Sequence, residues 1–332
     1  MKVQKGVLLL FLSLLHFYAN AQVQRTRDAY LMGGKFIITI VAGDSLTAER
    51  YIDTVIAEIS RIEYLISDWK PETQISKVNQ QAGIRPVKVD REVLELTERA
   101  ISMSRLTNGA FDISFAAMEK IWKFDGSEMK MPSKKVVKKA RANVGYKNII
   151  IDRDSSTIFL KTKGMKIGFG ALGEGYAADK CRELMLQKGI TAGIVNATGD
   201  VLTWGTRPDG TPWKIGVNDP FSNNKLIAAI SWEGAATTSG NYEKYAIING
   251  KRYAHIINPA TGYPVSGLTS VTVLGPSAEQ ANAFSTSIMV LGVKKGLRML
   301  KKFPDYKAIV ITDKQEIITS PNFNLEQYKI HY

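Results

Sequence analysis

Helix-forming and strand-forming segments follow one another irregularly along this 332-residue chain, and their order restricts the folds open to it. A β-branched run at Lys35–Val41 precedes an amphipathic helix pattern over Ala48–Trp69, in which isoleucines and a valine recur at three- and four-residue steps. Beyond residue 189, short strand patterns alternate with Gly, Asn and Pro turns. A doubly wound parallel sheet requires regular strand–helix–strand units. We therefore predict an α+β fold with mixed, largely antiparallel sheets and flanking helices.

Caps, stop signals and turn residues predict the other elements. Asp90 is a plausible N-cap, Asn108–Gly109 and Gly189 are stop signals, and Ser277–Gln280 forms a capping box. Asn249–Gly250 predicts a type I′ hairpin. The further helices are expected at 90–109, 133–143, 174–189 and 277–291, with another through 300, and paired strands at 148–152 and 157–161 and around a turn at 313–314.

Residues 1–21 are predicted to be a secretory signal peptide. Lys2 and Lys5 make its start positive, an apolar run follows at Val7–Leu15, and Ala19–Ala21 supplies a small-x-small cleavage site. A membrane-spanning helix needs about 20 apolar residues, so cleavage is favoured over anchoring. We expect one soluble, periplasmic or otherwise exported domain of residues 22–332, with no integral membrane segment after cleavage.

The chain has one cysteine and three histidines, too few for a disulfide framework, an iron–sulfur cluster or a zinc finger. Cys181 lies far from the cleavage point, so no lipoprotein cysteine is present, and its helical context predicts a small buried residue. His16 falls in the signal peptide and His331 next to the C-terminus, which leaves His255 as the interior imidazole. His255 is a candidate general base, and a structural role beside a turn carbonyl is the alternative.

A formal net charge of +13, or +11 without Lys2 and Lys5, raises the question of a nucleic-acid partner. The sharpest basic cluster is a predicted helix at Lys134–Arg141, which no groove-reading motif or stacking aromatic flanks. We predict a solvated helix face and no nucleic-acid binding. The surplus charge favours anionic ligands such as phosphates.

Three further segments are candidates for a functional role. The glycine-rich turn Gly168–Tyr176 opens a helix, where backbone N–H groups and the helix dipole favour a phosphate, although the next elements do not form a dinucleotide-binding βαβ unit. Asn196–Asp200 is a tight turn or a plain loop. Asn282 and Thr286 share one helix face as oxygen donors suited to Mg²⁺, with helix packing as the alternative.

Taken together in chain order, these motifs resemble the FAD:protein FMN transferases of the ApbE family. The resemblance runs from Leu31 to the C-terminal hairpin and implies an ApbE-like, T-fold-like single domain. The segments that carry it are Met32–Gly33, Ser67–Pro71, Ser76–Asn79, Gly109–Asp112, Gly173–Asp179, Asn196–Asp200, Thr238–Glu243 and His255–Gly262.

The resemblance implies transfer of FMN from FAD to a Thr or Ser hydroxyl of an exported flavoprotein, with AMP as the leaving group and Mg²⁺ neutralising the pyrophosphate. It assigns proton acceptance to His255 and the metal to Thr286, Asn282 and the Gly173 carbonyl. The isoalloxazine is expected against Trp69 and Met32. The implied FAD contacts are Met32, Trp69, Ala110, Phe111, Asp112, Ala171, Glu174 and Ile257.

At Gly168 and Asn282 the chain departs from the family's pattern, which has Asp at both positions. A neutral carboxamide is a weaker Mg²⁺ ligand than a carboxylate, so weaker metal binding is expected unless another acid compensates. The departures leave two alternatives open. One is a periplasmic FAD-binding protein that lacks turnover, and the other is an FAD pyrophosphatase that releases free FMN.

Overall fold

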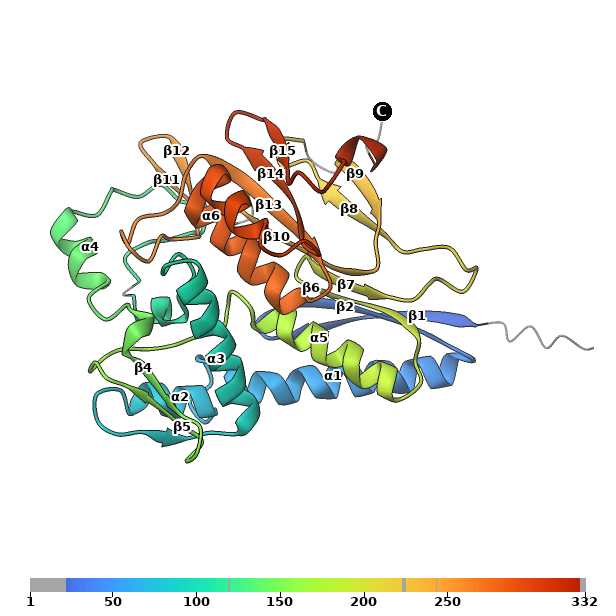
Figure 1. The fold of residues 1–332 in the computed structure, drawn as a ribbon, viewed down its shortest axis with the longest axis horizontal. Helices are drawn as coiled ribbons and strands as arrows, with labels where there is room; N and C mark the ends of the chain where they lie inside the picture. The colour runs from blue at the N-terminus through green and yellow to red at the C-terminus, as the bar shows by residue number, and fades with distance from the viewer. Residues whose placement is uncertain (1–21, 119, 223–224, 243, 329–332) are drawn as a thin grey trace, which may run out of the picture.

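The structure, a computed structural model, describes residues 22–328 apart from positions 119, 223–224 and 243. Its main sheet contains eight of the described strands, and every neighbouring pair is antiparallel (Figure 1). The predicted signal peptide lies outside the described residues. From edge to edge the strands are β1 (Val23–Leu31), β2 (Gly34–Ala42), β6 (Ala192–Ala197), β7 (Asp200–Trp204), β10 (Gly234–Gly240), β13 (Leu268–Gly275), β14 (Lys307–Thr312) and β15 (Ile317–Thr319).

The sheet joins segments that are far apart in sequence. Strand β2 pairs with β6, with Phe36 opposite Ala197 and Val41 opposite Ala192. Residues 43–191 are therefore inserted between two adjacent strands. The inserted chain contains most of the helices and a separate small sheet, as the blue-to-green part of Figure 1 shows.

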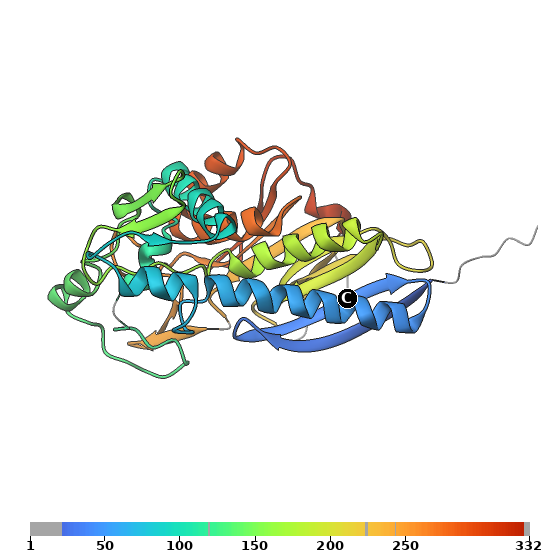
Figure 2. The same ribbon diagram turned by 90° about the horizontal axis from the view of Figure 1, so that it is seen from below.

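Helices α1 (Ser45–Ile66), α5 (Gly173–Gln187) and α6 (Ala278–Leu300) cover one face of the main sheet (Figures 1 and 2). Helix α1 begins at Asp44, whose carboxylate accepts the Thr47 backbone N–H at 2.8 Å. Its buried stripe includes Ile52, Ile59 and Ile62, and each such side chain contributes roughly 1.5–3 kcal/mol when fully buried. This packing fixes the helices against the sheet.

The part of the inserted chain between α1 and α5, residues 67–172, forms a lobe beside the main sheet, at the left of Figure 1. Helix α3 and strand β5 contribute buried residues to the same core as the main sheet, so the lobe is not separated by a second core. The elements of the lobe are α2 (Gln74–Gln80), β3 (Val87–Lys88), α3 (Arg91–Leu106), α4 (Lys134–Ala140), β4 (Ile149–Asp152) and β5 (Thr157–Leu160), and the hairpin of β11 (Tyr245–Ile248) and β12 (Lys251–Ala254) lies beside α4.

The other face of the main sheet is covered by the hairpin of β8 (Lys214–Asn218) and β9 (Leu226–Ser231). Ile215 and Ile230 of this hairpin share a small buried cluster with Ala236 and Leu274 of the sheet. Because neighbouring residues of a strand point to opposite faces, Ala235 and Val273 belong to the helix-covered core instead.

The predicted α+β class is confirmed by this arrangement, and several local predictions are confirmed with it. Asn249 and Gly250 have φ values of 52° and 74° and join β11 to β12 as a type I′ turn. Cys181 is fully buried, and burial raises the pKa of its thiol, in keeping with a structural residue.

One predicted helix end is displaced, and one predicted cap position forms no capping bond. Helix α1 ends at Ile66 rather than at Trp69. Asp90 precedes α3 but makes no capping bond, because its carboxylate accepts the Gln74 side-chain amide at 2.7 Å. The two predicted C-terminal helices, to about residue 291 and through 300, are confirmed, and they follow each other within α6 across Gly292, which has a left-handed φ of 74°. Within the described ranges, no helix is long and apolar enough to cross a membrane.

Candidate functional site

The turn between β1 and β2 carries Met32 to the start of α5. Met32 and Gly33 have φ values of 51° and 80°, as a two-residue type I′ turn requires. The Met32 methyl carbon lies 3.5 Å from where a Cβ on Gly173 would stand. Met32, the predicted flavin contact, and Gly173, the predicted metal residue at the first position of α5, are therefore neighbours.

Glu174 is held by the turn between β6 and β7. Thr198 donates its hydroxyl to the Glu174 carboxylate at 2.6 Å. Burial raises the pKa of Glu174, and the Thr198 hydrogen bond and the charge of Lys244 oppose that shift. A Cβ on Gly34 would stand 2.1 Å from the Thr198 methyl carbon, so β2 can start this close to the turn only because residue 34 is glycine.

Asp200 connects β7 with β10 and α6. One carboxylate oxygen accepts the Thr238 backbone N–H at 3.1 Å, and the other accepts the side-chain amide of Asn282. Asp200 and Asn282 are both buried. The structure thus places a carboxylate directly beside the helix position at which the family's pattern has Asp and this chain has Asn.

The hydroxyl of Thr286 lies in the same region. Ser239 Oγ is 3.2 Å from Thr286 Oγ1 and 2.8 Å from Ser285 Oγ. Oxygen donors of this kind suit Mg²⁺, which is commonly held by one or two carboxylates together with substrate phosphates and water. In the described part of the chain, no group of three or more His, Cys, Asp or Glu side chains could hold a metal ion. Asn282 and Thr286 supply neutral oxygen donors, a set that would fit Mg²⁺ only together with ligands from a bound diphosphate and from water.

His255 lies just beyond β12, at the surface of the molecule. Its Nδ1 is 3.2 Å from the Lys244 carbonyl oxygen, which also accepts the His255 backbone N–H. Because a carbonyl only accepts, this contact assigns the proton to Nδ1 and leaves the Nε2 lone pair available. Loss of hydration around the ring lowers the pKa of His255. A neutral imidazole at pH 7 with an available nitrogen can act as a base.

Trp69 stands on the rim of the lobe with 74% of its surface exposed. The Lys120 ammonium nitrogen lies 3.9 Å from the centre of its ring. The neighbouring Asp68 is close to the turn before α5, because a Cβ on Gly168 would stand 3.0 Å from its Oδ2. Burial raises the pKa of Asp68. Trp69 therefore offers an open aromatic face near the glycine-rich turn.

The other predicted FAD residues lie around this region in mainly structural contacts. Ala110, Phe111 and Ile257 are buried, and Ala171 packs against the core. The Asp112 carboxylate accepts bonds from the Ser114 backbone and hydroxyl and from the Tyr146 backbone N–H. Burial raises the pKa of Asp112. The link to the glycine-rich turn here is a backbone bond from Gly168 N–H to the Ile113 carbonyl at 3.0 Å.

Helices α5 and α6 are joined where they carry the candidate residues. The Asp179 carboxylate accepts the Ser277 hydroxyl at 2.7 Å and the backbone N–H groups of Ala278 and Glu279 at 3.1 and 3.0 Å. A Cβ on Gly175 would stand 2.4 Å from the Ala278 carbonyl oxygen, so the two backbones meet directly. This junction fixes Glu174 of α5 relative to Asn282 of α6.

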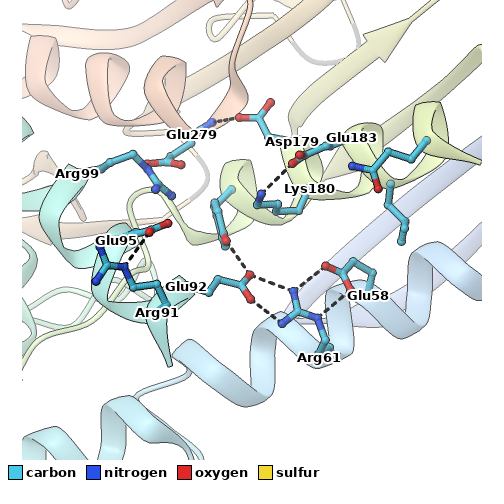
Figure 3. A pocket seen from close by; sticks show the side chains of 13 residues that line it. Glu58, Arg61, Arg91, Glu92, Glu95, Arg99, Asp179, Lys180, Glu183 and Glu279 are labelled. Carbon is cyan, nitrogen blue, oxygen red and sulfur yellow. Dashed lines mark hydrogen bonds and ion pairs between the residues drawn. The ribbon is translucent and has the colours of Figure 1, made fainter. Parts of the chain in front are cut away.

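A pocket of about 630 Å³ lies on the other side of this junction, among α1, α3, α5 and α6 (Figure 3). Arg61 binds both Glu58 and Glu92, and Glu92 also accepts the Tyr176 hydroxyl at 2.6 Å. The bond from Arg61 lowers the pKa of Glu92. The ion pairs and hydrogen bonds among the residues that line the pocket link the surrounding helices. None of the predicted site residues lines the pocket.

Comparison with known proteins decides the family. The sequence model described as the ApbE family matches residues 32–310. This chain belongs to the ApbE family. A relative named FAD:protein FMN transferase, from Klebsiella pneumoniae strain 342, is 31% identical over 296 residues, which cover 88% of this chain and 90% of that protein. One of the same name from Escherichia coli K12 is 27% identical over 278 residues, which cover 82% and 79%.

Solved ApbE structures have the same fold. The crystal structure of the ApbE protein of Thermotoga maritima has a TM-score of 0.83 at 28% identity and covers 93% of this chain and 100% of that one. The flavin transferase ApbE from Vibrio cholerae has a TM-score of 0.79 at 22% identity, covers 92% and 99%, and supports the fold alone. The predicted membership of this transferase family is confirmed.

Sequence reasoning missed several contacts that hold the ApbE site together. Asp200 and Ser239 lay within recognised motifs, but no local signal paired them with Asn282 and Thr286. Lys244, which links His255 to the surroundings of Glu174, belonged to no motif. An alignment that showed residues 200 and 282 changing together would have been the signal.

Removing the Asp179 carboxylate tests the α5–α6 junction. We expect Asp179→Ala to lower the free energy of unfolding by about 1–3 kcal/mol, because it removes the cap of α6 and leaves backbone N–H groups unpaired. Urea denaturation measures the change. Glu183→Ala, on the same helix, removes only an exposed pair with Lys180 and should cost under about 0.5 kcal/mol. Equal losses in the two variants would show that the junction adds nothing.

Proposed function

We propose that this chain is an exported FAD:protein FMN transferase that moves FMN from FAD to a Thr or Ser hydroxyl of an exported flavoprotein. The observation that carries the proposal is the meeting of the Met32 turn, the start of α5, the β6–β7 turn and the Asn282–Thr286 face of α6. The activity named for the relatives supports it.

Substrate binding uses the groups that surround this meeting point. The isoalloxazine lies against Met32 and the exposed face of Trp69, and the diphosphate lies near the first turn of α5, where backbone N–H groups and the helix dipole favour anions. The Glu174 carboxylate, which accepts the Thr198 hydroxyl at 2.6 Å, lies in the same first turn of α5. Ala110, Phe111, Asp112, Ala171 and Ile257 complete the proposed FAD contacts.

His255 Nε2 accepts the proton of the acceptor hydroxyl as its oxygen attacks the phosphorus of the FMN half. A new O–P bond forms, the bond between that phosphorus and the bridging oxygen breaks, and AMP leaves with the bonding electrons. The proton remains on the imidazole, whose Nδ1 is held by the Lys244 carbonyl. Such a transfer depends chiefly on position and on neutralisation of charge.

Asn282, Thr286 and the Gly173 carbonyl would hold Mg²⁺, which when bound neutralises diphosphate charge. Asp200 orients Asn282 by accepting its amide N–H, which turns the carboxamide oxygen away from the carboxylate. A negatively charged side chain is therefore retained beside position 282. We infer that this pairing preserves metal binding despite the loss of the family's Asp.

The proposal includes removal of residues 1–21 and one domain of residues 22–332. Strand β1 begins at Val23 and pairs along its length with β2. Cleavage after Ala21 would therefore leave the whole main sheet in the mature protein.

Incubation of the mature chain with FAD, Mg²⁺ and an exported flavoprotein domain that carries one acceptor Thr tests the activity. We expect flavin fluorescence that stays with the denatured acceptor, and one AMP for each flavin attached. An acceptor with that Thr replaced by Val is the control. Free FMN with AMP would show pyrophosphatase activity, and intact bound FAD would show a binding protein, and either result contradicts the transferase.

His255→Ala should lower the transfer rate by about 10²–10⁴-fold, because a general base is lost. In the parent, the rate should fall with acid only below pH 6.5, since the pKa of His255 is lowered from that value and only the neutral ring accepts a proton. Single-turnover rates against pH measure both effects. FAD affinity measured by fluorescence should be unchanged, and added imidazole should restore part of the rate. If His255→Ala keeps the parent's transfer rate and the same fall in rate at acid pH, His255 is not the general base.

Calorimetry with Mg²⁺ tests the residues around Asn282. Asn282→Asp should tighten binding roughly 10-fold by adding a carboxylate, and Asp200→Asn should weaken it by a similar factor. Without metal, Asn282→Asp should also unfold at a lower temperature, because two carboxylates repel each other, and Mg²⁺ should reverse the loss. Identical Mg²⁺ affinities in all three proteins would place the metal elsewhere.

A further inference from the structure

The positive charge of the chain is concentrated in one segment. Residues 120–147 contain nine basic and two acidic residues, so they carry +7 of the +11 expected for the mature chain. All eight lysines among them are exposed. We call this segment the basic lobe, and Figures 1 and 2 show its helix α4 at the edge of the molecule.

The basic lobe is attached to the loop that follows His255. Val137 and Ala140 bury the inner side of α4, and a Cβ on Gly262 would stand 2.8 Å from a Val137 methyl carbon. The Trp122 indole N–H donates to the Gly262 carbonyl at 3.1 Å. The lysines of α4 are thus held in a fixed relation to the candidate catalytic loop.

The basic lobe also borders the site at its other end. Lys120 covers the ring of Trp69. The Phe124 ring meets the His255 ring edge-on, with centroids 6.4 Å apart. The first residues of the basic lobe therefore contact both Trp69, the proposed flavin position, and His255, the proposed base.

Within the described residues, no basic side chain of the basic lobe forms an ion pair, whereas Arg61, Arg99 and Arg153 outside residues 120–147 bind carboxylates. Met131 and Val136 lie among the lysines with 41% and 44% of their surfaces exposed. Unpaired like charges repel each other, which disfavours their clustering unless a partner of opposite charge offsets it. The basic lobe lies beside His255, so we expect its partner to be a molecule that must reach His255.

We propose that the basic lobe docks an acidic segment of the acceptor flavoprotein and so delivers the acceptor hydroxyl to His255. This inference rests on the proposed function and adds the chemistry of the partner's surface. Complementary charge raises association rates and orients the two proteins before contact. An anionic membrane is the less favoured partner, because Met131 and Val136 are the only large apolar side chains that the described residues of the basic lobe expose.

Two fluorescein-labelled 16-residue peptides, each with a central Thr, test the docking by fluorescence anisotropy. One has Asp and Glu on both sides of the Thr, and the other has Asn and Gln at those positions. We expect the acidic peptide to bind the mature chain at least about 10-fold more tightly, and a rise from 50 to 300 mM NaCl to weaken it about 10-fold. Binding needs no turnover, so the result does not depend on whether transfer occurs.

The variant K134E/K135E/K138E/K139E should lose at least about 10-fold in acidic-peptide affinity. Its matched control is K294E/K295E/K301E/K302E, which makes the same charge change on exposed lysines of α6 and its C-terminal end. The control should lose less than about twofold, and FAD affinity should be unaltered in both. Equal losses in the two variants, or equal affinity for both peptides, would overturn the proposal. Phosphatidylglycerol vesicles that bind through the α4 lysines while the peptide does not would overturn it in favour of a membrane.

Discussion

The meeting of α5 and α6 is the contact on which the rest of the site depends. A carboxylate from the middle of α5 caps the start of α6, and Gly175 lets the two backbones touch. Each helix then places a different set of groups in the same region. The first turn of α5 supplies its N–H groups and Glu174, and the second and third turns of α6 supply Asn282 and Thr286. Neither helix alone positions both an anion-binding terminus and the oxygen donors, so the fold must assemble before the site exists.

The fold was predictable at the level of elements because local signals are strong there. The isoleucine stripe of α1, the Asn249–Gly250 turn and the stop at Gly189 each act through neighbouring residues. The pairing of β2 with β6 was not predictable in this way, since it depends on which distant strands share a buried face. Ends of elements were less certain for the same reason, as Asp90 shows by bonding Gln74 rather than its own helix.

Motifs in the sequence named Met32, Glu174 and His255 as candidates, and the structure adds the neighbours of each. The contacts of the site were not predictable where they join residues that lie far apart in the sequence. Asn282 taken by itself suggested a weakened metal position, and the structure adds the carboxylate of Asp200 beside it. The basic residues of α4 taken by themselves suggested a solvated face, and their attachment to the Gly262 loop gives that charge a place next to the proposed base. In both cases the missing information was proximity between segments many residues apart.

The insertion of residues 43–191 between β2 and β6 bears on the export that we propose for this protein. Until residue 192 has been synthesised, β2 lacks its inner neighbour and the buried face of α1 lacks much of its cover. Contacts between residues so distant in sequence form slowly, because a long loop must close first. The main sheet of this chain therefore cannot close until more than half of the chain has been made, and the chain remains unfolded until then. A translocation channel for unfolded polypeptides requires that state.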